Sequence, residues 1–89
     1  MSKQIFLIGY DIIDNKRRVK LGRFLAKKGI RIEYLIFYVK AYKNEMVEIV
    51  MKINDIIDTE MDDVRIYEIE NYGIALGRAD LLDEMFIIK

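Results

Sequence analysis

The stretch IFLIGYD at residues 5–11 is an unbroken apolar run that ends in a single carboxylate. This composition is typical of a strand buried on both faces, because such strands are rich in large apolar side chains and delay charge until the chain returns to water. Asp14 and three cations at 16–18 follow within one short turn. An acid at the end of a buried strand, just ahead of arginines, is typical of a site that holds a cation and a phosphate together.

Composition limits the chemistry open to this chain. Its 89 residues, 53% apolar and 34% charged, are enough for one domain and too few for two. The sequence has no Cys and no His, which excludes disulfides, thiolate zinc sites and imidazole-based triads. Hydrolysis would therefore have to use carboxylates and a hard metal ion.

The same composition predicts where the protein acts. No apolar run approaches the roughly 20 residues needed to cross a bilayer, and the start of the chain lacks a signal-like apolar core. We therefore expect a cytoplasmic protein without membrane contact. A domain this small gains stability by burying apolar surface against a second copy, so we also expect an oligomer.

Charge is divided unevenly along the chain although the net charge is zero. Residues 1–43 carry eleven Lys or Arg against three Asp or Glu, whereas residues 44–89 carry four against twelve. Eight cations and no acid lie between Asn15 and Ile32. A polyanion such as DNA or RNA could bind this basic segment and release its counterions.

Two interpretations of the basic segment stay open. Its lysines could simply keep exposed helix faces soluble, which is a common role for charged runs. The arginines favour phosphate binding, because a guanidinium group grips phosphate bidentately. The candidate nucleic-acid contacts are therefore Arg17, Arg18 and Arg31.

The hydrophobic period predicts the order of the elements. A strand at residues 5–10 precedes a helix that Asp14 caps and Gly29 ends, with an inward stripe that includes Leu21 and Leu25. Residues 30–41 are extended, as one long strand or as two short ones, and no turn residue decides between them.

The second half of the chain repeats the pattern. Asn44 is expected to cap a second helix, and residues 64–69 are expected to form a further strand. The resulting order predicts a ferredoxin-like βαββαβ sandwich of the α+β class in a single domain covering residues 1–89, with both helices on one face of the sheet. Tyr34, Tyr38 and Tyr67 could line the other face or a dimer interface, or they could be ordinary strand aromatics.

The sequence resembles a known family, that of CRISPR-associated protein two, the smaller member of the spacer-acquisition pair. The residues that carry the resemblance are Tyr10-Asp11-Ile12, Asp14, Lys16-Arg17-Arg18, Leu21, Leu25, Gly29, Arg31-Ile32, Phe37 and Asp63-Val64-Arg65-Ile66-Tyr67. Glu33, Leu35 and Tyr38 stand where the family commonly has Gln, Ser and Glu. The change to Leu35 removes a hydroxyl group near the expected site.

The resemblance implies a homodimer in which the C-terminal strand, within a tail at residues 73–89, completes the sheet of the neighbouring subunit. It implies that Asp11 of each copy faces its twin across the two-fold axis and serves as catalytic residue and metal ligand. Two carboxylates can hold magnesium or manganese, which would polarise a phosphoryl oxygen, whereas one is a poor site. Tyr10, Asp14 and Phe37 would support this site.

Two functions follow from the resemblance and remain alternatives. One is metal-dependent endonuclease activity on RNA or DNA within CRISPR adaptation, the spacer-acquisition step of antiviral defence. The other is a non-catalytic dimeric scaffold that binds duplex DNA and bridges the CRISPR integrase. For the enzyme, Asp14 is either a nearby second acid or a helix cap, and Asp11 could instead be structural and accept hydrogen bonds from Arg17 or Arg18. For the scaffold, the basic segment would bind the duplex backbone and the acidic second half would contact a partner protein. A third and weaker alternative is an RNA-binding module, whose diagnostic aromatic strand pattern is absent from residues 33–39.

Overall fold

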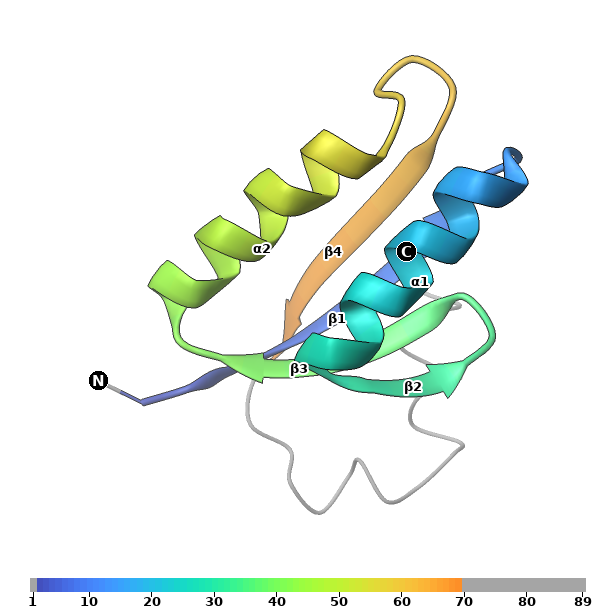
Figure 1. Ribbon diagram of the computed structural model, residues 1–89. Coiled ribbons are helices and arrows are strands. Elements are labelled where there is room, and N and C mark those ends of the chain that lie inside the picture. Colours follow the sequence, from blue (N-terminus) through green and yellow to red (C-terminus); the bar gives the residue numbers. More distant parts are fainter. Residues whose placement is uncertain (1, 70–89) are drawn as a thin grey trace.

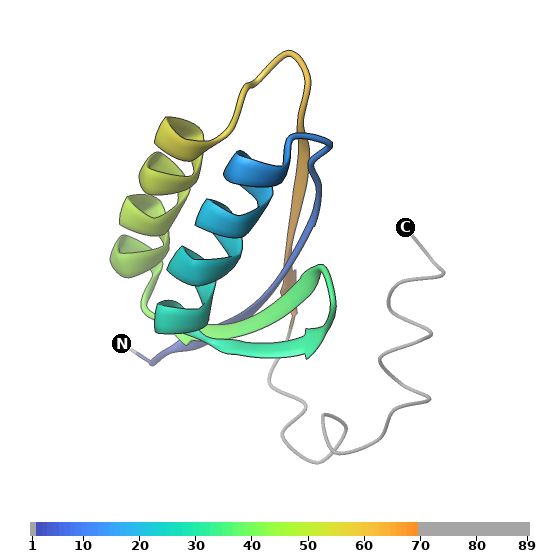
Figure 2. The same ribbon diagram turned by 45° about the vertical axis from the view of Figure 1, so that its right-hand side comes forward.

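The strand β1 (Gln4–Asp11) is the centre of the fold, because it pairs with a neighbour on each side. The structure is a computed structural model that describes residues 2–69. The other elements in this range are α1 (Asn15–Lys28), β2 (Ile30–Glu33), β3 (Ile36–Ala41), α2 (Lys43–Ile56) and β4 (Asp63–Ile69). Within residues 2–69 the sheet has four antiparallel strands in the order β2-β3-β1-β4. Both helices cover the same face of this sheet (Figures 1 and 2), which confirms the predicted ferredoxin-like α+β sandwich.

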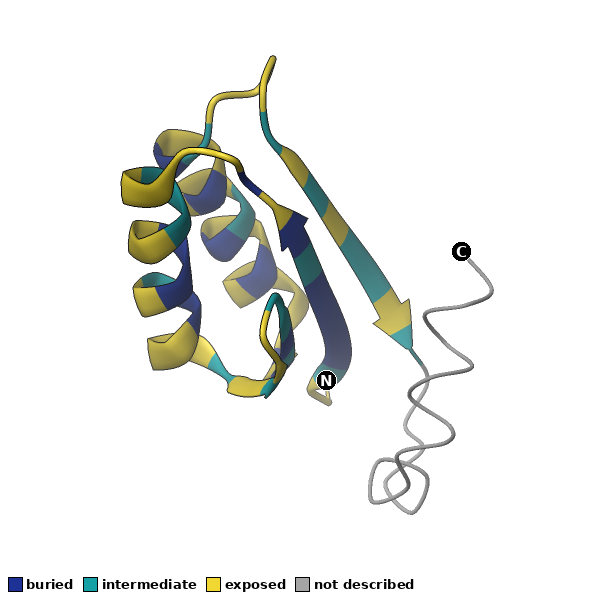
Figure 3. Ribbon diagram, turned by 90° about the vertical axis from the view of Figure 1, so that its right-hand side faces the viewer, coloured by how far each residue is buried: buried dark blue, intermediate teal, exposed yellow. Residues whose placement is uncertain are grey.

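Burial explains why the apolar run takes the central position. Phe6, Ile8 and Tyr10 point toward the helices and belong to the main core, whereas Ile5 and Leu7 alternate to the opposite face and are also buried. Figure 3 shows β1 as buried along most of its length, while the edge strand β4 alternates between half-buried and exposed residues. The prediction of a strand buried on both faces is confirmed.

The ends of α1 agree with the sequence signals. The Asp14 carboxylate accepts a hydrogen bond from the Arg17 backbone N–H at 2.9 Å, and the Gly29 N–H donates to the Leu25 carbonyl. A side chain at position 29 would collide with the Tyr38 carbonyl of β3, so glycine is required by the close approach of helix and strand. The inward face of α1 buries Leu21 and Leu25 in the core.

Residues 30–41 form two strands, which settles the question that the sequence left open. β2 and β3 make a hairpin with a turn at Tyr34 and Leu35, and the pairing shifts register between Arg31 and Glu33. The Leu35 carbonyl accepts a hydrogen bond from the Tyr10 N–H at 3.1 Å. The turn is therefore held against the end of β1.

The start of α2 corrects one prediction. Asn44 does not cap this helix, since the first helical residue is Lys43 and the capping position is Tyr42. The Glu45 carboxylate accepts a hydrogen bond from the Tyr42 backbone N–H at 2.8 Å, so an acid inside the first turn satisfies the capping position from within the helix. The buried face of α2 consists of Met46, Ile49, Ile53 and Ile56.

Two further predictions concern membrane contact and the C-terminal tail. Across residues 2–69, neither helix has the length and apolar character needed to cross a bilayer. The predicted tail at residues 73–89, with its C-terminal strand, lies outside the described residues and stays a prediction.

Candidate functional site

Asp11 lies at the carboxyl end of β1, where the buried strand returns to the surface. Its side chain is exposed and makes no hydrogen bond or ion pair with any of residues 2–69. It belongs to the sheet face that neither helix covers, because it alternates with the buried core positions of β1. A cavity of about 330 Å³ beside it is lined by Gly9, Ile36, Asp63, Arg65 and Tyr67, among others.

The closest acid to Asp11 along the sheet is already paired. Asp63 stands opposite Asp11 in the β1–β4 register, and its carboxylate accepts a hydrogen bond from Arg65 Nε at 3.1 Å. Tyr67 and Asp63 both raise the pKa of the Arg65 guanidinium, so this cation stays charged. The cavity therefore combines one unpaired carboxylate, Asp11, with a permanent positive charge.

Residues 2–69 of one copy do not complete a metal site. Within residues 2–69, no three acidic, His or Cys side chains come close enough to hold an ion together. The Asp11 carboxylate offers the oxygen donors that Mg²⁺ prefers, but it is a single ligand and Asp63 is held by Arg65. The donor type fits a hard metal, and the donor number requires ligands from outside these residues.

Arg17 meets a partner that the sequence did not reveal. Its Nε donates to Asp62 Oδ2 at 2.7 Å and its Nη2 donates to Asp62 Oδ1 at 3.1 Å, which is a bidentate pair. The Asp62 side chain is 0% exposed, and it also accepts the backbone N–H of Asp58 at 2.8 Å. The hydrogen bond from Arg17 lowers the pKa of the Asp62 carboxyl, although burial acts in the opposite direction. This pair joins the start of α1 to the loop before β4.

Arg18 is also engaged within the chain. Its guanidinium donates to the carbonyl of Ile12 at 3.1 Å, to the carbonyl of Ile13 at 3.4 Å and to Asn15 Oδ1 at 2.6 Å. These bonds brace the short loop between β1 and α1. Arg18 thereby fixes the direction in which β1 ends, and with it the position of Asp11.

Arg31 packs against aromatic rings on the β2–β3 hairpin. Its guanidinium carbon lies 4.6 Å from the Phe37 ring centroid and 5.9 Å from the Tyr34 ring centroid, and it donates to the Tyr34 carbonyl. The Phe37 ring in turn stacks on Tyr10 with 6.3 Å between centroids. Tyr10 and Phe37, predicted as supporting residues, are therefore buried core groups behind the end of β1.

Asp14 occupies the helix cap that the sequence offered as one of its two roles. Besides accepting the Arg17 backbone N–H, its carboxylate lies 3.9 Å from Arg17 Nη1. The structure thus brings Asp14, Arg17 and Asp62 together, while Asp11 faces the other side of the sheet. The acids among residues 58–63 have a charge opposite to that of the cations at 16–18, and this complementarity is the sequence signal that could have pointed to Asp62 as a partner of Arg17.

Comparison with known proteins agrees with this arrangement. A family model described as CRISPR associated protein Cas2 matches residues 4–75. A protein of Thermodesulfovibrio yellowstonii named CRISPR-associated endoribonuclease Cas2 2 is 35% identical over 81 residues, covering 89% of this chain and 89% of the relative.

Solved structures extend the comparison to three dimensions. A hypothetical protein from Thermus thermophilus superposes with a TM-score of 0.75 at 27% identity, covering 79% of this chain and 85% of that one. A chain from a partial Cas6-RT-Cas1–Cas2 complex superposes with a TM-score of 0.68 at 32% identity, covering 76% of this chain and 80% of that one. Because the family match spans most of the sequence and the fold agrees, the chain belongs to the CRISPR-associated protein Cas2 family.

Proposed function

We propose that this protein is a CRISPR adaptation protein that hydrolyses phosphodiester bonds with two Asp11 carboxylates brought together by a homodimer. The observation that carries the proposal is the position of Asp11. It is an exposed carboxylate at the end of the central strand, without a side-chain partner among residues 2–69. An unpaired acid that the fold positions so firmly has a role beyond stability.

The sheet face opposite the helices supports the dimer. Leu7 lies between Tyr38 and Tyr67 in the register of three neighbouring strands, so this face carries a broad apolar and aromatic band. A self-complementary contact through such a face would relate two copies by a two-fold axis and bring identical residues near that axis together. Asp11 is the acid of β1 on this face.

The pair would hold magnesium or manganese, because two carboxylates, with oxygens of the nucleic acid and water, approach octahedral coordination. When bound, such an ion supplies positive charge at the phosphoryl oxygens. Within the chain, Arg18 holds the loop after β1 in place, and Arg65 adds a fixed positive charge beside Asp11.

The names of relatives favour RNA as the substrate. Relatives from Thermodesulfovibrio yellowstonii, Nitrosomonas europaea and Chloroflexus aurantiacus are named CRISPR-associated endoribonucleases, at 35%, 30% and 29% identity. We extend this activity to the present chain, and we place it in the cytoplasm, where such a substrate occurs.

A second candidate function is a non-catalytic scaffold that holds duplex DNA and bridges the CRISPR integrase. It is favoured by the solved complex that contains Cas1 together with Cas2, whose Cas2-like chain is 32% identical to this one. Leu35 also favours it, because the side chain beside Asp11 that lines the same cavity is apolar and offers no hydroxyl.

Asp11→Asn tests the enzyme against the scaffold. The exchange keeps the size of the side chain and removes its charge, so we expect loss of magnesium-dependent RNA cleavage by a factor of at least about 100. Asp63→Asn is the matched control, because it removes the charge of a neighbouring acid that already accepts a hydrogen bond from Arg65. We expect the control to keep activity within about tenfold of the wild type, and chelation of the metal to stop both active proteins.

Three outcomes decide the proposal. Equal cleavage by the wild type and Asp11→Asn would show that Asp11 is not catalytic. A wild type that cleaves nothing but co-purifies with the integrase from its host would replace the enzyme with the scaffold. Sedimentation of Asp11→Asn must show the same oligomer as the wild type for the loss to be assigned to chemistry.

A further inference from the structure

Gly9 lies inside the central strand β1, where contacts within residues 2–69 give no reason for a glycine. Its φ angle is not positive, and the nearest atoms that an added Cβ would meet are 3.9 Å away, which is ordinary van der Waals contact. Glycine weakens the interior of a strand, because it costs backbone entropy and has no side chain to pack. A glycine without such an internal need marks a place where a ligand or another chain approaches the strand closely.

The missing side chain of Gly9 leaves a hollow on the sheet face that the helices do not cover. In the register of the sheet, Gly9 lies between Ile36 of β3 and Arg65 of β4. It lines the same cavity of about 330 Å³ as Asp11, which is two residues further along β1 and therefore about 7 Å away on the same face. The hollow thus opens beside the proposed catalytic carboxylate.

The hollow differs in character from the apolar band of the same face. That band, which is centred on Leu7, is the surface proposed to meet a second copy of the chain. At Gly9 the face changes from apolar to charged, since Arg65 flanks this position and Asp11 follows it along β1. Because charged residues are depleted at the cores of protein interfaces, a polar ligand matches the hollow better than a partner side chain does.

Arg65 supplies the positive charge of this hollow. It is the one cation among the described residues that line the cavity, and its side chain is 59% exposed. Asp63 accepts a hydrogen bond from its Nε at 3.1 Å, whereas neither Nη group donates to a carboxylate within residues 2–69. Tyr67 and Asp63 raise the pKa of this guanidinium, so it stays charged. Its two Nη groups can therefore donate to the oxygens of a phosphate.

Other side chains of the cavity are poorer donors. Leu35 stands where the family commonly has Ser, and it has no hydroxyl group. The Tyr10 hydroxyl is directed toward α1, since a Cβ atom at Gly22 would lie 3.1 Å from it. Within the described lining this leaves Tyr67 and Arg65, of which only Arg65 carries a charge.

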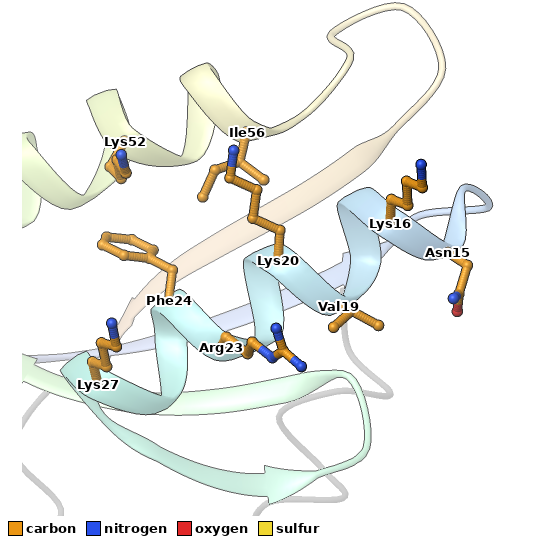
Figure 4. Close-up of a pocket in the computed structure, with 9 residues that line it drawn as sticks. All are labelled: Asn15, Lys16, Val19, Lys20, Arg23, Phe24, Lys27, Lys52 and Ile56. Carbon is orange, nitrogen blue, oxygen red and sulfur yellow. The ribbon is translucent and has the colours of Figure 1, made fainter.

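The cations of α1 lie on the opposite side of the sheet. Four of them recur at intervals of four, three and four residues, and they form a stripe along one side of the helix. The stripe and one cation of α2 line a groove between the two helices (Figure 4): Lys16, Lys20, Arg23, Lys27 and Lys52. Both helices cover the face of the sheet that is opposite to Asp11, so this groove faces away from the Asp11 cavity.

We propose that Arg65 binds the phosphodiester group of RNA that lies over Gly9, and that this contact positions the RNA for cleavage at Asp11. The inference rests on the proposed nuclease function and deepens it, because it names a substrate contact within the same chain. The phosphate needs a cation there, since Asp11 and Asp63 would otherwise repel it. Arg65 keeps its proton throughout and donates to phosphoryl oxygens as negative charge develops on them. The absence of a side chain at Gly9 lets the nucleic-acid backbone come close enough for this contact.

The first test compares two cation variants of the full-length chain. Arg65→Gln removes the proposed contact, and Lys40→Gln removes an exposed cation of β3 that lies opposite Ile5, at the far end of β1 from Asp11. In metal-dependent cleavage of a labelled single-stranded RNA, kcat/KM should fall at least about 100-fold for Arg65→Gln and stay within about threefold of the wild type for Lys40→Gln. Affinity for the same RNA is measured in EDTA between about 50 and 200 mM salt, where the loss of one phosphate contact should reduce the salt slope by about 0.7.

Gly9→Val tests the hollow separately. The urea midpoint of unfolding should be equal to that of the wild type or higher, because nothing crowds this position and Val favours strands. Cleavage and RNA affinity should nevertheless each fall at least about tenfold, because the added side chain displaces the phosphate. A purely structural role of Gly9 would not lower cleavage while the stability is kept.

Each outcome decides the inference. Equal salt slopes for Arg65→Gln and Lys40→Gln would overturn it, whether or not the wild type cleaves RNA. Full cleavage by Gly9→Val would also overturn it, and so would a changed oligomer of this variant in sedimentation, which would assign the hollow to a partner copy. Equal cleavage by the wild type and Asp11→Asn is a different result and would remove the proposed nuclease, whereas Asp11-dependent cleavage that survives in Arg65→Gln would remove this inference alone.

Discussion

Arg17 and Lys20 are three residues apart on α1, and their charges meet different surroundings. Arg17 is bound bidentately to Asp62, whose side chain is 0% exposed, whereas Lys20 lines an open groove between α1 and α2 with no ion-pair partner among residues 2–69. The charge of Arg17 joins α1 to the loop before β4, whereas the charge of Lys20 faces solvent.

This difference shows that residue type alone does not identify a phosphate site. Arginine is the better phosphate ligand in general, and for that reason Arg17 was predicted to bind nucleic acid. The Asp62 carboxylate binds the Arg17 guanidinium with the planar, bidentate geometry that a phosphate would use, so this guanidinium already has a partner within the chain. Lys20 and Lys27, whose role the sequence left open between solubility and phosphate binding, line the groove between α1 and α2.

Arg17→Gln and Lys20→Gln should differ in how strongly they destabilise the fold. Removing Arg17 leaves the Asp62 carboxylate, whose side chain is 0% exposed, without its main partner, so we expect a clear fall in the urea midpoint of unfolding. Lys20→Gln changes an exposed side chain and should alter the free energy of unfolding by no more than about 0.5 kcal/mol.

The double variant Arg17→Gln with Asp62→Asn supplies the control. If the two side chains act as a pair, their combined destabilisation is smaller than the sum of the single effects. Additive effects, or equal midpoints for Arg17→Gln and Lys20→Gln, would contradict the assignment of Arg17 to the fold.

Much of the fold follows from local signals. The apolar run that forms β1, the cap at Asp14 and the end of α1 at Gly29 are all visible in sequence, because each depends on neighbouring residues. The turn at Tyr34 and Leu35 is not visible, since both residues continue the apolar alternation of the flanking strands. The position of this turn is set by a hydrogen bond from the Tyr10 N–H to the Leu35 carbonyl, which joins residues distant in sequence.

The candidate site likewise has some features that the sequence shows and others that only the packing of the chain creates. Asp11 is recognisable from its place at the end of a buried run, and the stripe on α1 has a helical period that sequence can show. The pairing of Arg17 with Asp62 joins residues 45 positions apart, and Lys52 reaches the groove from the other helix. The first contact depends on how α1 meets the loop before β4, and the second depends on how the two helices pack, which no local pattern contains.

Acid should weaken the Arg17–Asp62 contact, which is the smallest effect expected. The pKa of Asp62 in the folded chain lies below its ordinary value of 3.8, because Arg17 stabilises the carboxylate. The contact therefore stabilises the fold above that value, and this stabilisation is lost as the pH falls below it toward the folded pKa.

Thermal unfolding of the wild type and Arg17→Gln, followed from about pH 6 down to about pH 2, measures this effect. The difference between their midpoints should shrink as the pH falls, because the two chains then share a protonated Asp62. A difference that stays constant over this range would mean that Asp62 does not contribute through its charge.

The meeting of two Asp11 residues across a homodimer is the central claim, and the absence of Cys from the sequence makes it directly measurable. Asp11→Cys introduces a single thiol, which a short bifunctional maleimide can link to its twin only if the two lie close together. Asn54→Cys, on the exposed side of α2, is the control. We predict a covalent dimer for position 11 and a monomer for position 54. A covalent dimer for position 54 alone, or a monomer by sedimentation for the wild type, would contradict the account.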